Sequence, residues 1–365
     1  MILALYAGPG GIDQGARILG IRQPLHGYDI DADTSATATA AGFRRTQASV
    51  PELDPEDFPT VTGAIITPPC PPFSRGGLGK GMTDFPAIRN ALTLLGDNIA
   101  GMVSDDAYQA ALADLHDPRS ALLVETLRFA FRLPKVRWMV AEQVPAVAPL
   151  WQEISAELAM TTNWTYLAVL TVAAQDLGVA SCRTRTFLIA TRSYAPDLTG
   201  LPTRALWTTG RFAPPRDELP PAGHRFPAAT MAAAIGWPAG ERVNTRGNRR
   251  TSGGNEFSAD GPSWCLTSKA RSWKRVSDGT PLTASQAGLL TGFPADYPWQ
   301  GSRSKQFLQA ADVVSPPVAA AVLGSTLGID WQPAIRAYLA SIYPRAGDVP
   351  PVLQSSLFDL IGAAS

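Results

Sequence analysis

Lysine, histidine and cysteine are scarce in this chain of 365 residues, and its formal net charge is zero. Only five of the 31 basic residues are lysine, so arginine carries most of the positive charge, and its planar guanidinium suits phosphates and base edges. A neutral total excludes global charge as the force that would bind nucleic acid or a membrane. Three cysteines exclude a disulfide framework, and they lack the spacing of zinc ligands, so we expect no metal site.

Long apolar runs are also missing from the chain. No stretch approaches the roughly 20 residues that cross a bilayer, so the sequence predicts no membrane contact. The chain starts on an apolar, strand-like segment without a charged leader, and we therefore expect a reducing, cytoplasmic setting. Hydrophobic residues make up 45% of the chain, which is enough for one large or two medium cores.

Short apolar segments alternate with helical patterns over the first 190 residues. Strands are expected at 2–6, 25–30, 63–67, 138–141, 165–172 and 186–191, and helices at 12–19, 120–132 and 150–160. This alternation predicts an α/β fold with a doubly wound, mostly parallel sheet.

The pattern breaks after residue 192 and gives way to a segment rich in proline, glycine, arginine and tryptophan. Over 201–280 there are twelve basic and six acidic residues, whereas 1–60 holds eight acidic and four basic residues. Helical periodicity returns at 284–290 and 313–327. This asymmetry predicts a second, smaller and irregular domain that carries a local positive charge.

A glycine-rich turn follows the first expected strand and opens a helix, with Tyr6, Gly8, Gly10 and Gly11 in it. Glycines there let a ligand approach the backbone, and a helix N-terminus favours negative charge. Asp29 ends the next strand, where a carboxylate accepts hydrogen bonds from ribose hydroxyls. The pattern fits a nucleotide cofactor in general, NAD included, and a plain tight turn is the alternative.

Cys70 stands at the tip of a proline-rich turn, Thr-Pro-Pro-Cys-Pro-Pro, directly after an expected strand. The carboxyl end of a parallel strand is where ligands bind, and an accessible thiol with a lowered pKa is a nucleophile. A buried, inert cysteine is the alternative, but the flanking polar residues fit it poorly.

Glu142 ends another strand on the same edge, in the sequence Ala-Glu-Gln-Val-Pro. Partial desolvation raises the pKa of such a carboxyl group, so that it donates a proton near neutrality. Arg183 and Arg185 precede a further strand, and their spacing points both side chains the same way. Salt-bridge roles are the alternative for the acid and for the arginine pair.

These motifs are followed by 289–294 (LLTGFP) and 309–317 (QAADVVSPP). Their order resembles that of the DNA (cytosine-5)-methyltransferase family, and the resemblance covers about residues 2–330. The resemblance implies S-adenosylmethionine as the methyl donor and a two-domain fold. It implies a catalytic and cofactor-binding domain at 1–192 and a target-recognition domain at 193–308. Residues 309–345 would complete the catalytic domain, and 346–365 would form a tail.

The resemblance also implies roles for single residues. Cys70 would attack the base, Glu142 would hydrogen-bond it at N3, and Arg185 would contact its carbonyl oxygen, supported by Arg183. The implied cofactor-binding residues are Tyr6, Gly8, Gly10, Gly11, Asp29, Ile30, Ser49, Pro69, Leu122 and Asp312.

Five positions depart from the family's pattern. Gln143 replaces the Asn after the catalytic Glu, Pro71 replaces a Gln after the Cys, and Ser181 replaces a Gln before the arginines. Ser49 stands where an Asp is expected to meet the adenine amine, and Asp312 replaces the Asn of the final motif. These last two bear most on the affinity or identity of the donor.

Double-stranded DNA is the expected partner, bound by a chain that we expect to be a monomer. The candidate DNA contacts are Ser74, Arg242, Arg246, Arg249, Arg250, Lys269 and Arg271. Glycines at 75–82 predict a mobile loop that closes over DNA. The tail segment Gln354–Phe358 resembles the short peptide that docks on a bacterial sliding clamp, and a tail helix packed on its own domain is the alternative.

The favoured function is therefore C5 methylation of a flipped-out cytosine, in an orphan enzyme or in a restriction–modification pair near the nucleoid. An RNA cytosine-5 methyltransferase, a relative that transfers a different group, and a DNA-binding regulator without catalysis are alternatives. An NAD oxidoreductase would leave the Pro-Pro-Cys turn and the basic segment without a role.

Overall fold

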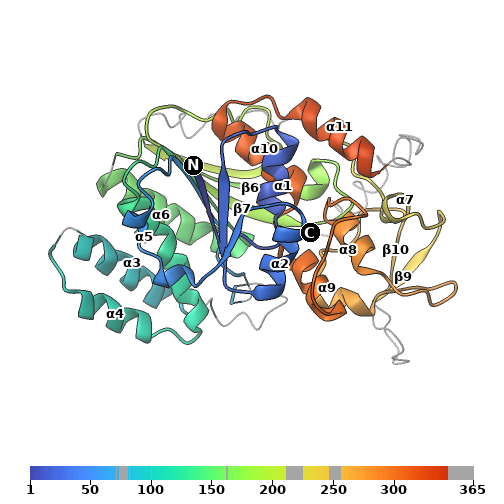
Figure 1. Cartoon of the computed structure of the whole chain (residues 1–365), viewed down its shortest axis with the longest axis horizontal. Helices are drawn as coiled ribbons and strands as arrows, with labels where there is room; N and C mark the ends of the chain where they lie inside the picture. Colours follow the sequence, from blue (N-terminus) through green and yellow to red (C-terminus); the bar gives the residue numbers. More distant parts are fainter. Residues whose placement is uncertain are drawn as a thin grey trace, which may run out of the picture.

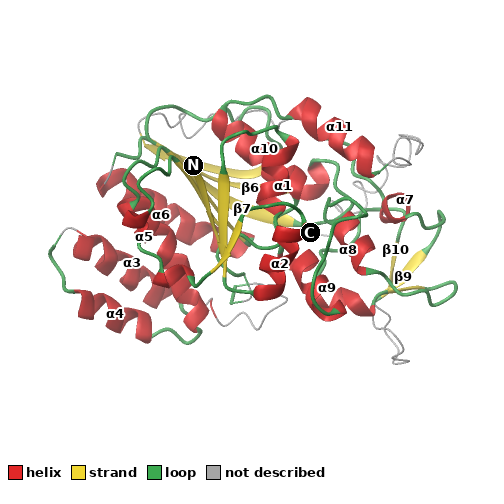
Figure 2. Cartoon of the chain, viewed as in Figure 1, coloured by secondary structure: helices red, strands yellow, loops and turns green. Residues whose placement is uncertain are grey.

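The computed structural model describes residues 1–70, 72–73, 81, 83–99, 101–161, 163–210, 225–245 and 256–343. An eight-stranded sheet lies between two layers of helices, and a three-stranded sheet stands beside them (Figure 1, Figure 2). The predicted α/β fold, with a doubly wound sheet and a smaller irregular part, is confirmed.

The large sheet has the strand order β3-β2-β1-β4-β5-β7-β6-β8. Strands β1 to β5 pair in parallel, whereas β7 pairs antiparallel to both of its neighbours, β5 and β6. The bounds are β1 Ile2–Leu5, β2 Leu25–Asp29, β3 Arg45–Gln47, β4 Gly63–Ile66, β5 Trp138–Gln143, β6 Tyr166–Ala173, β7 Thr184–Thr191 and β8 Thr203–Gly210. The sequence predicts all of these strands except β3 and β8, and β8 carries the sheet beyond residue 192.

One face of the sheet is covered by α3 to α6, and the other by α1, α10 and α11 (Figure 1). The first layer consists of α3 Phe85–Ile99, α4 Asp105–Ala113, α5 Val124–Arg132 and α6 Ala148–Thr161, and the second of α1 Gly11–Ile18, α10 Pro316–Leu327 and α11 Gln332–Ile342. A Cβ at Gly15 would lie 2.6 Å from the Cβ of Ala319, so glycine there lets α1 and α10 pack closely. Helix α10, late in the sequence, thus packs against α1, near its start.

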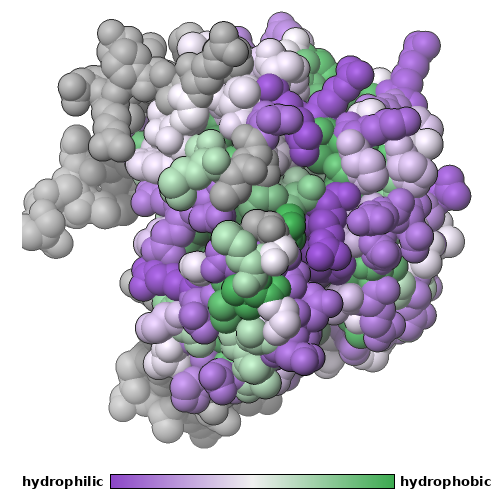
Figure 3. Space-filling view, turned by 90° about the vertical axis from the view of Figure 1, so that its left-hand side faces the viewer, coloured by the Kyte–Doolittle hydropathy of each residue, from purple (hydrophilic) through white to green (hydrophobic). Residues whose placement is uncertain are grey.

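The sequence does not predict three of the helices in the first 190 residues, α2, α3 and α4. Helix α2, Ala32–Ala40, begins at Asp31, whose carboxylate accepts a hydrogen bond from the Thr34 amide. Helices α3 and α4 follow the glycine segment 75–82, in a stretch for which the sequence predicts no helix. The face they form is largely hydrophilic around a small apolar group (Figure 3).

The smaller part of the molecule lies at the right of Figure 1. It holds α7 Met231–Ile235, β9 Arg242–Asn244, β10 Glu256–Ser258, β11 Lys274–Arg275, α8 Ala284–Leu290 and α9 Arg303–Asp312. Its core gathers aromatic and aliphatic side chains, among them Val243, Phe257 and Trp273. The stretch Arg303–Leu327 is long and apolar enough to cross a membrane, but 89% of its most apolar window is buried inside the protein, as in a core helix.

Candidate active site

Three strands meet where the candidate catalytic residues lie. Cys70 follows the carboxyl end of β4, and Glu142 lies at the carboxyl end of β5. Because β7 is antiparallel to β5 and pairs Thr186 with Gln143, its beginning reaches the same edge and brings Arg185 there. Three of the four candidate catalytic residues, Cys70, Glu142 and Arg185, line one pocket of about 330 Å³, a volume typical of small-molecule sites.

Glu142 and Arg185 form a buried ion pair in this pocket, with 2.9 Å between Oε1 and Nε. Burial raises the pKa of the Glu142 carboxyl, and the nearby Arg185 and Arg183 guanidinium groups oppose that rise. A carboxyl group with a raised pKa gives up a proton closer to neutrality. The geometry therefore suits Glu142 to proton donation or hydrogen bonding toward a ligand in the pocket.

The thiol of Cys70 is half-buried and reduced. Desolvation raises its pKa to about 11, and the Arg185 guanidinium only partly offsets that rise. The expectation of a lowered pKa is therefore wrong, because the loss of solvation and the nearby Asp312 carboxylate outweigh the arginines.

Gln143 holds the turn that carries Cys70. Its side-chain Nε2 donates to the carbonyl oxygens of Pro68 (3.0 Å) and Pro69 (3.2 Å), and its Oε1 accepts from the Val144 amide. The amide thus ties the end of β5 to the end of β4. The sequence identified Gln143 only as a departure from the family's pattern, and gave no sign of this positioning role.

The glycine turn and Asp29 form the other end of the pocket. The two carboxylate oxygens of Asp29 accept hydrogen bonds from the amides of Gly8 and Asp31, each over 2.9 Å. Gly8 has φ of +61°, and no atom lies within 4 Å of where a Cβ would stand, so the backbone faces open space. Asp29 thereby fixes the glycine turn, and each of its oxygens retains capacity to accept a further hydrogen bond.

The other two glycines of the turn serve the packing around it. A Cβ at Gly10, where φ is +108°, would lie 2.6 Å from the Tyr297 hydroxyl oxygen. A Cβ at Gly11 would lie 2.0 Å from the main-chain oxygen of Val314, in the segment that joins α9 to α10. Gly11 lines the pocket, while Gly10 packs against Tyr297 and Phe43.

Arg183 lies behind the pocket, where its guanidinium is buried. It donates hydrogen bonds to the main-chain carbonyls of Ala311 and Asp312 at the end of α9. A cation at a helix C-terminus also interacts favourably with the helix dipole. In this structure Arg183 therefore fixes the end of α9, and Arg185 alone of the pair lines the pocket.

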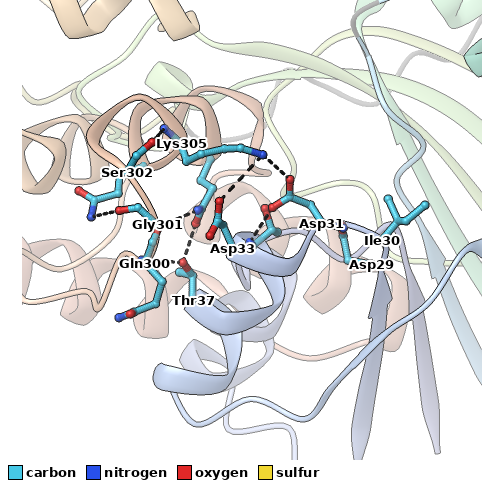
Figure 4. Close-up of polar contacts among 12 residues, drawn as sticks. Asp29, Ile30, Asp31, Asp33, Thr37, Gln300, Gly301, Ser302 and Lys305 are labelled. Carbon is cyan, nitrogen blue, oxygen red and sulfur yellow. Dashed lines mark hydrogen bonds and ion pairs between the residues drawn. The ribbon is translucent and has the colours of Figure 1, made fainter.

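The other predicted cofactor residues all line the pocket, namely Tyr6, Ile30, Ser49, Pro69, Leu122 and Asp312. Ile30 is 68% exposed and Leu308 is 38% exposed, so both offer apolar surface to a ligand. At the pocket's edge Lys305 forms an ion pair with Asp31, over 2.7 Å (Figure 4). The sequence missed Lys305 and Leu308, because only the fold brings α9 to the end of β2.

The predicted DNA contacts fall into two groups. Arg242, Lys269 and Arg271 belong to the smaller part of the molecule, and all three are exposed. Arg242 reaches Glu256 across the small sheet, with 3.3 Å between Nε and Oε2. The other candidates and segments lie outside the described residues, namely Ser74, Arg246, Arg249, Arg250, most of the glycine loop 75–82 and the tail segment 354–358.

The sequence and the fold both resemble those of methyltransferases. No protein-family profile matches the chain. The type II methyltransferase M.AplI of Arthrospira platensis is 26% identical over 362 residues, which span 96% of this chain and 92% of that protein.

Solved structures of methyltransferases share the fold. The methyltransferase EhMeth of Entamoeba histolytica has a TM-score of 0.57, 12% identity and coverage of 90% of this chain and 97% of that one. A DNMT2 mutant of Spodoptera frugiperda has a TM-score of 0.57, 16% identity and coverage of 89% and 99%. A DNA modification methyltransferase encoded within an E. coli prophage has a TM-score of 0.54, 16% identity and coverage of 90% and 98%.

Proposed function

We propose that the chain belongs to the DNA (cytosine-5)-methyltransferase family, and that it transfers a methyl group from S-adenosylmethionine to C5 of a cytosine in duplex DNA. One observation carries the proposal. The thiol of Cys70, the Glu142–Arg185 ion pair and the glycine turn with Asp29 share a single pocket. A nucleophile, an acid and a turn that can bind a nucleotide cofactor lie within one cavity. This combination suits methyl transfer to a nucleobase.

The residues of the pocket fit S-adenosylmethionine. The open space at Gly8 leaves room for a ligand against the backbone, and the Asp29 carboxylate can accept hydrogen bonds from ribose hydroxyls. Ile30 and Leu308 would supply apolar surface for the adenine, and the end of the pocket near Cys70 would hold the reactive part. When bound, the cofactor would supply an electrophilic methyl group on a sulfonium.

The chemistry assigned to the protein concerns the cytosine ring. The Cys70 thiol loses its proton to solvent as Sγ bonds to C6, and Glu142 protonates or hydrogen-bonds N3 as negative charge develops. The electron density then gathers at C5, which becomes nucleophilic. Arg185, already paired with Glu142, suits the carbonyl oxygen of the same ring.

Duplex DNA is the favoured substrate because positive charge is concentrated in the segment 201–280. Arg242, Lys269 and Arg271 are exposed there and can contact phosphates. A cytosine inside a duplex must leave the base stack to reach Cys70, at a cost of a few kcal/mol. An RNA cytosine is the alternative substrate for the same chemistry.

Expression in a host without cytosine methylation tests the proposal. Base-resolution mapping of host DNA should find 5-methylcytosine at a defined set of sites, and the Cys70→Ser variant should produce none. Thermal unfolding of both proteins controls for loss of fold. DNA without modified cytosines from the wild-type strain would refute DNA methylation, and modified cytosines in RNA alone would establish the alternative.

A further inference from the structure

Asp312 ends α9 at the pocket that also holds Cys70, Glu142 and Arg185. We propose that its carboxylate accepts the C5 proton of the methylated cytosine adduct, and so releases the product from Cys70. The inference rests on the proposed function and goes beyond it, because that function requires a proton acceptor without naming one.

Four carboxylates line the pocket, and three of them already have partners. Asp29 accepts hydrogen bonds from two main-chain amides, and Glu142 is paired with Arg185. Asp31 caps α2 and forms an ion pair with Lys305 (Figure 4). The Asp312 carboxylate accepts no hydrogen bond from any residue that the structure describes, and its side chain is exposed to the pocket. It is therefore the carboxylate that is free to take a proton.

The main chain around Asp312 is held on both sides. Arg183 donates to the carbonyls of Ala311 and Asp312, and its guanidinium is buried behind the pocket. On the other side, the oxygen of Val314 packs so closely on Gly11 that a Cβ there would lie 2.0 Å away. A base fixed by such contacts does not need to be ordered during the reaction.

Asp312 lines the same pocket as Cys70, Glu142 and Arg185, and its charge acts on the thiol. Its carboxylate raises the pKa of the Cys70 thiol, and the Arg183 and Arg185 guanidinium groups act on it in turn. Desolvation by the surrounding protein raises the pKa of Asp312 despite these two cations. A carboxylate with a raised pKa is a stronger base, which suits proton abstraction near neutral pH.

The step balances without a further reactant. After methyl transfer, C5 carries both the methyl group and its original hydrogen, and C6 is bonded to Sγ of Cys70. The Asp312 carboxylate takes the proton, and the C5–H electron pair forms the C5=C6 double bond. The C6–S bond breaks, its electron pair returns to Sγ, and Asp312 later loses the proton to solvent.

The Asp312→Asn variant tests the proposal, because it removes the carboxylate and nearly keeps the size of the side chain. The substrate is duplex DNA from a methylation-free host, labelled with tritium at C5 of cytosine, with labelled S-adenosylmethionine in a single turnover. The wild type should release tritium together with methyl transfer. The variant should transfer methyl groups but release tritium about 100-fold more slowly, and a methylated protein–DNA adduct should accumulate on denaturing gels.

Matched measurements separate the outcomes. Asp31→Asn removes a different pocket carboxylate, and its tritium release should keep pace with methyl transfer. A long duplex made with 5-fluorocytosine should trap the wild type and Asp312→Asn equally, because a C5–F bond offers no proton. Normal tritium release by Asp312→Asn, or a changed KM for the cofactor alone, would overturn the proposal. A wild type that is not trapped would instead refute the proposed function itself.

Discussion

The side-chain amide of Gln143 donates a hydrogen bond to the main-chain carbonyl of Pro68, 3.0 Å away. This contact ties β5, which carries Glu142, to the turn that carries Cys70. The acid and the nucleophile are therefore held in one geometry by a residue that has neither role.

Replacing Gln143 with Leu should disturb that geometry without altering the cofactor cradle. Two carbonyls of the turn and the Val144 amide would lose their partner, and an unsatisfied buried group costs about 1–3 kcal/mol. We expect trapping on 5-fluorocytosine DNA to slow about tenfold or more, with little change in cofactor affinity. Gln109→Leu, on the exposed surface of α4, is the control. Equal trapping rates for the two variants would show that the amide does not position Cys70.

Gly11→Ala should destabilise the protein where the first and last parts of the catalytic domain meet. The new Cβ would lie 2.0 Å from the Val314 oxygen and 2.7 Å from a Val313 methyl carbon, and both belong to the segment that follows α9. Overpacking of this kind costs about 1–3 kcal/mol or more. Urea unfolding should show the loss as a lower midpoint.

Gly96→Ala is the matched control for that measurement. Gly96 lies within α3, where a Cβ would meet only the flexible end of Glu157, at 3.0 Å. Alanine favours a helix interior by about 1 kcal/mol over glycine. We expect unchanged or higher stability for this variant, and a similar loss in both variants would exclude the close approach at Gly11 as the cause.

The sequence predicts the position of Cys70 and Glu142 well, because the carboxyl ends of neighbouring parallel strands meet at one edge. It does not predict how Arg185 arrives there. Its strand runs antiparallel, and an antiparallel strand presents its beginning, not its end, to that edge. Direction within a sheet depends on the connections between strands, which hydrophobic patterns do not encode.

Helix α3 shows a different limit of the sequence reading. Its apolar residues Ile88, Ala91, Leu92 and Leu95 recur at helical spacing and are buried, so the pattern was present. We predict from the sequence a mobile loop only for the glycine segment 75–82 before it, and no helix here. Strand β8 has mostly half-exposed or exposed residues, so it lacks the continuous apolar run that identified the inner strands.

The roles of Arg183 and Asp29 depend on contacts that no local pattern contains. Arg183 bonds a carbonyl 128 positions further along the chain, and Asp29 bonds an amide 21 positions before it. The sequence predicts which residue types gather at the site. Only the fold shows that Arg183 binds main-chain carbonyls, and that the Asp312 carboxylate accepts no hydrogen bond within the described part of the chain.

Ser49→Asp should strengthen binding of S-adenosylmethionine. Ser49 lines the pocket where the family's pattern has an acid, and its side chain caps no helix. A carboxylate there would accept a charge-assisted hydrogen bond from the adenine amine, worth about 1.5–3 kcal/mol, so the Kd should fall about tenfold or more. Ser49→Asn, of similar size but uncharged, is the control in titration calorimetry. A Kd that stays constant or rises in Ser49→Asp would refute adenine binding at this end of the pocket.

Alkylation of Cys70 in the ligand-free protein should depend steeply on pH. Burial raises the pKa of this thiol to about 11, so only the small thiolate fraction reacts near neutrality. The rate should rise about tenfold for each pH unit between about pH 7 and about pH 9.

Arg185→Gln removes the cation that lowers the pKa of the Cys70 thiol most, and the variant should react more slowly at every pH in that range. Arg89→Gln, on the exposed face of α3, should match the wild type. Peptide mass spectrometry distinguishes Cys70 from the exposed Cys182 and Cys265. Alkylation of Cys70 that is complete and independent of pH near neutrality would show that the arginines, rather than burial, control the thiol.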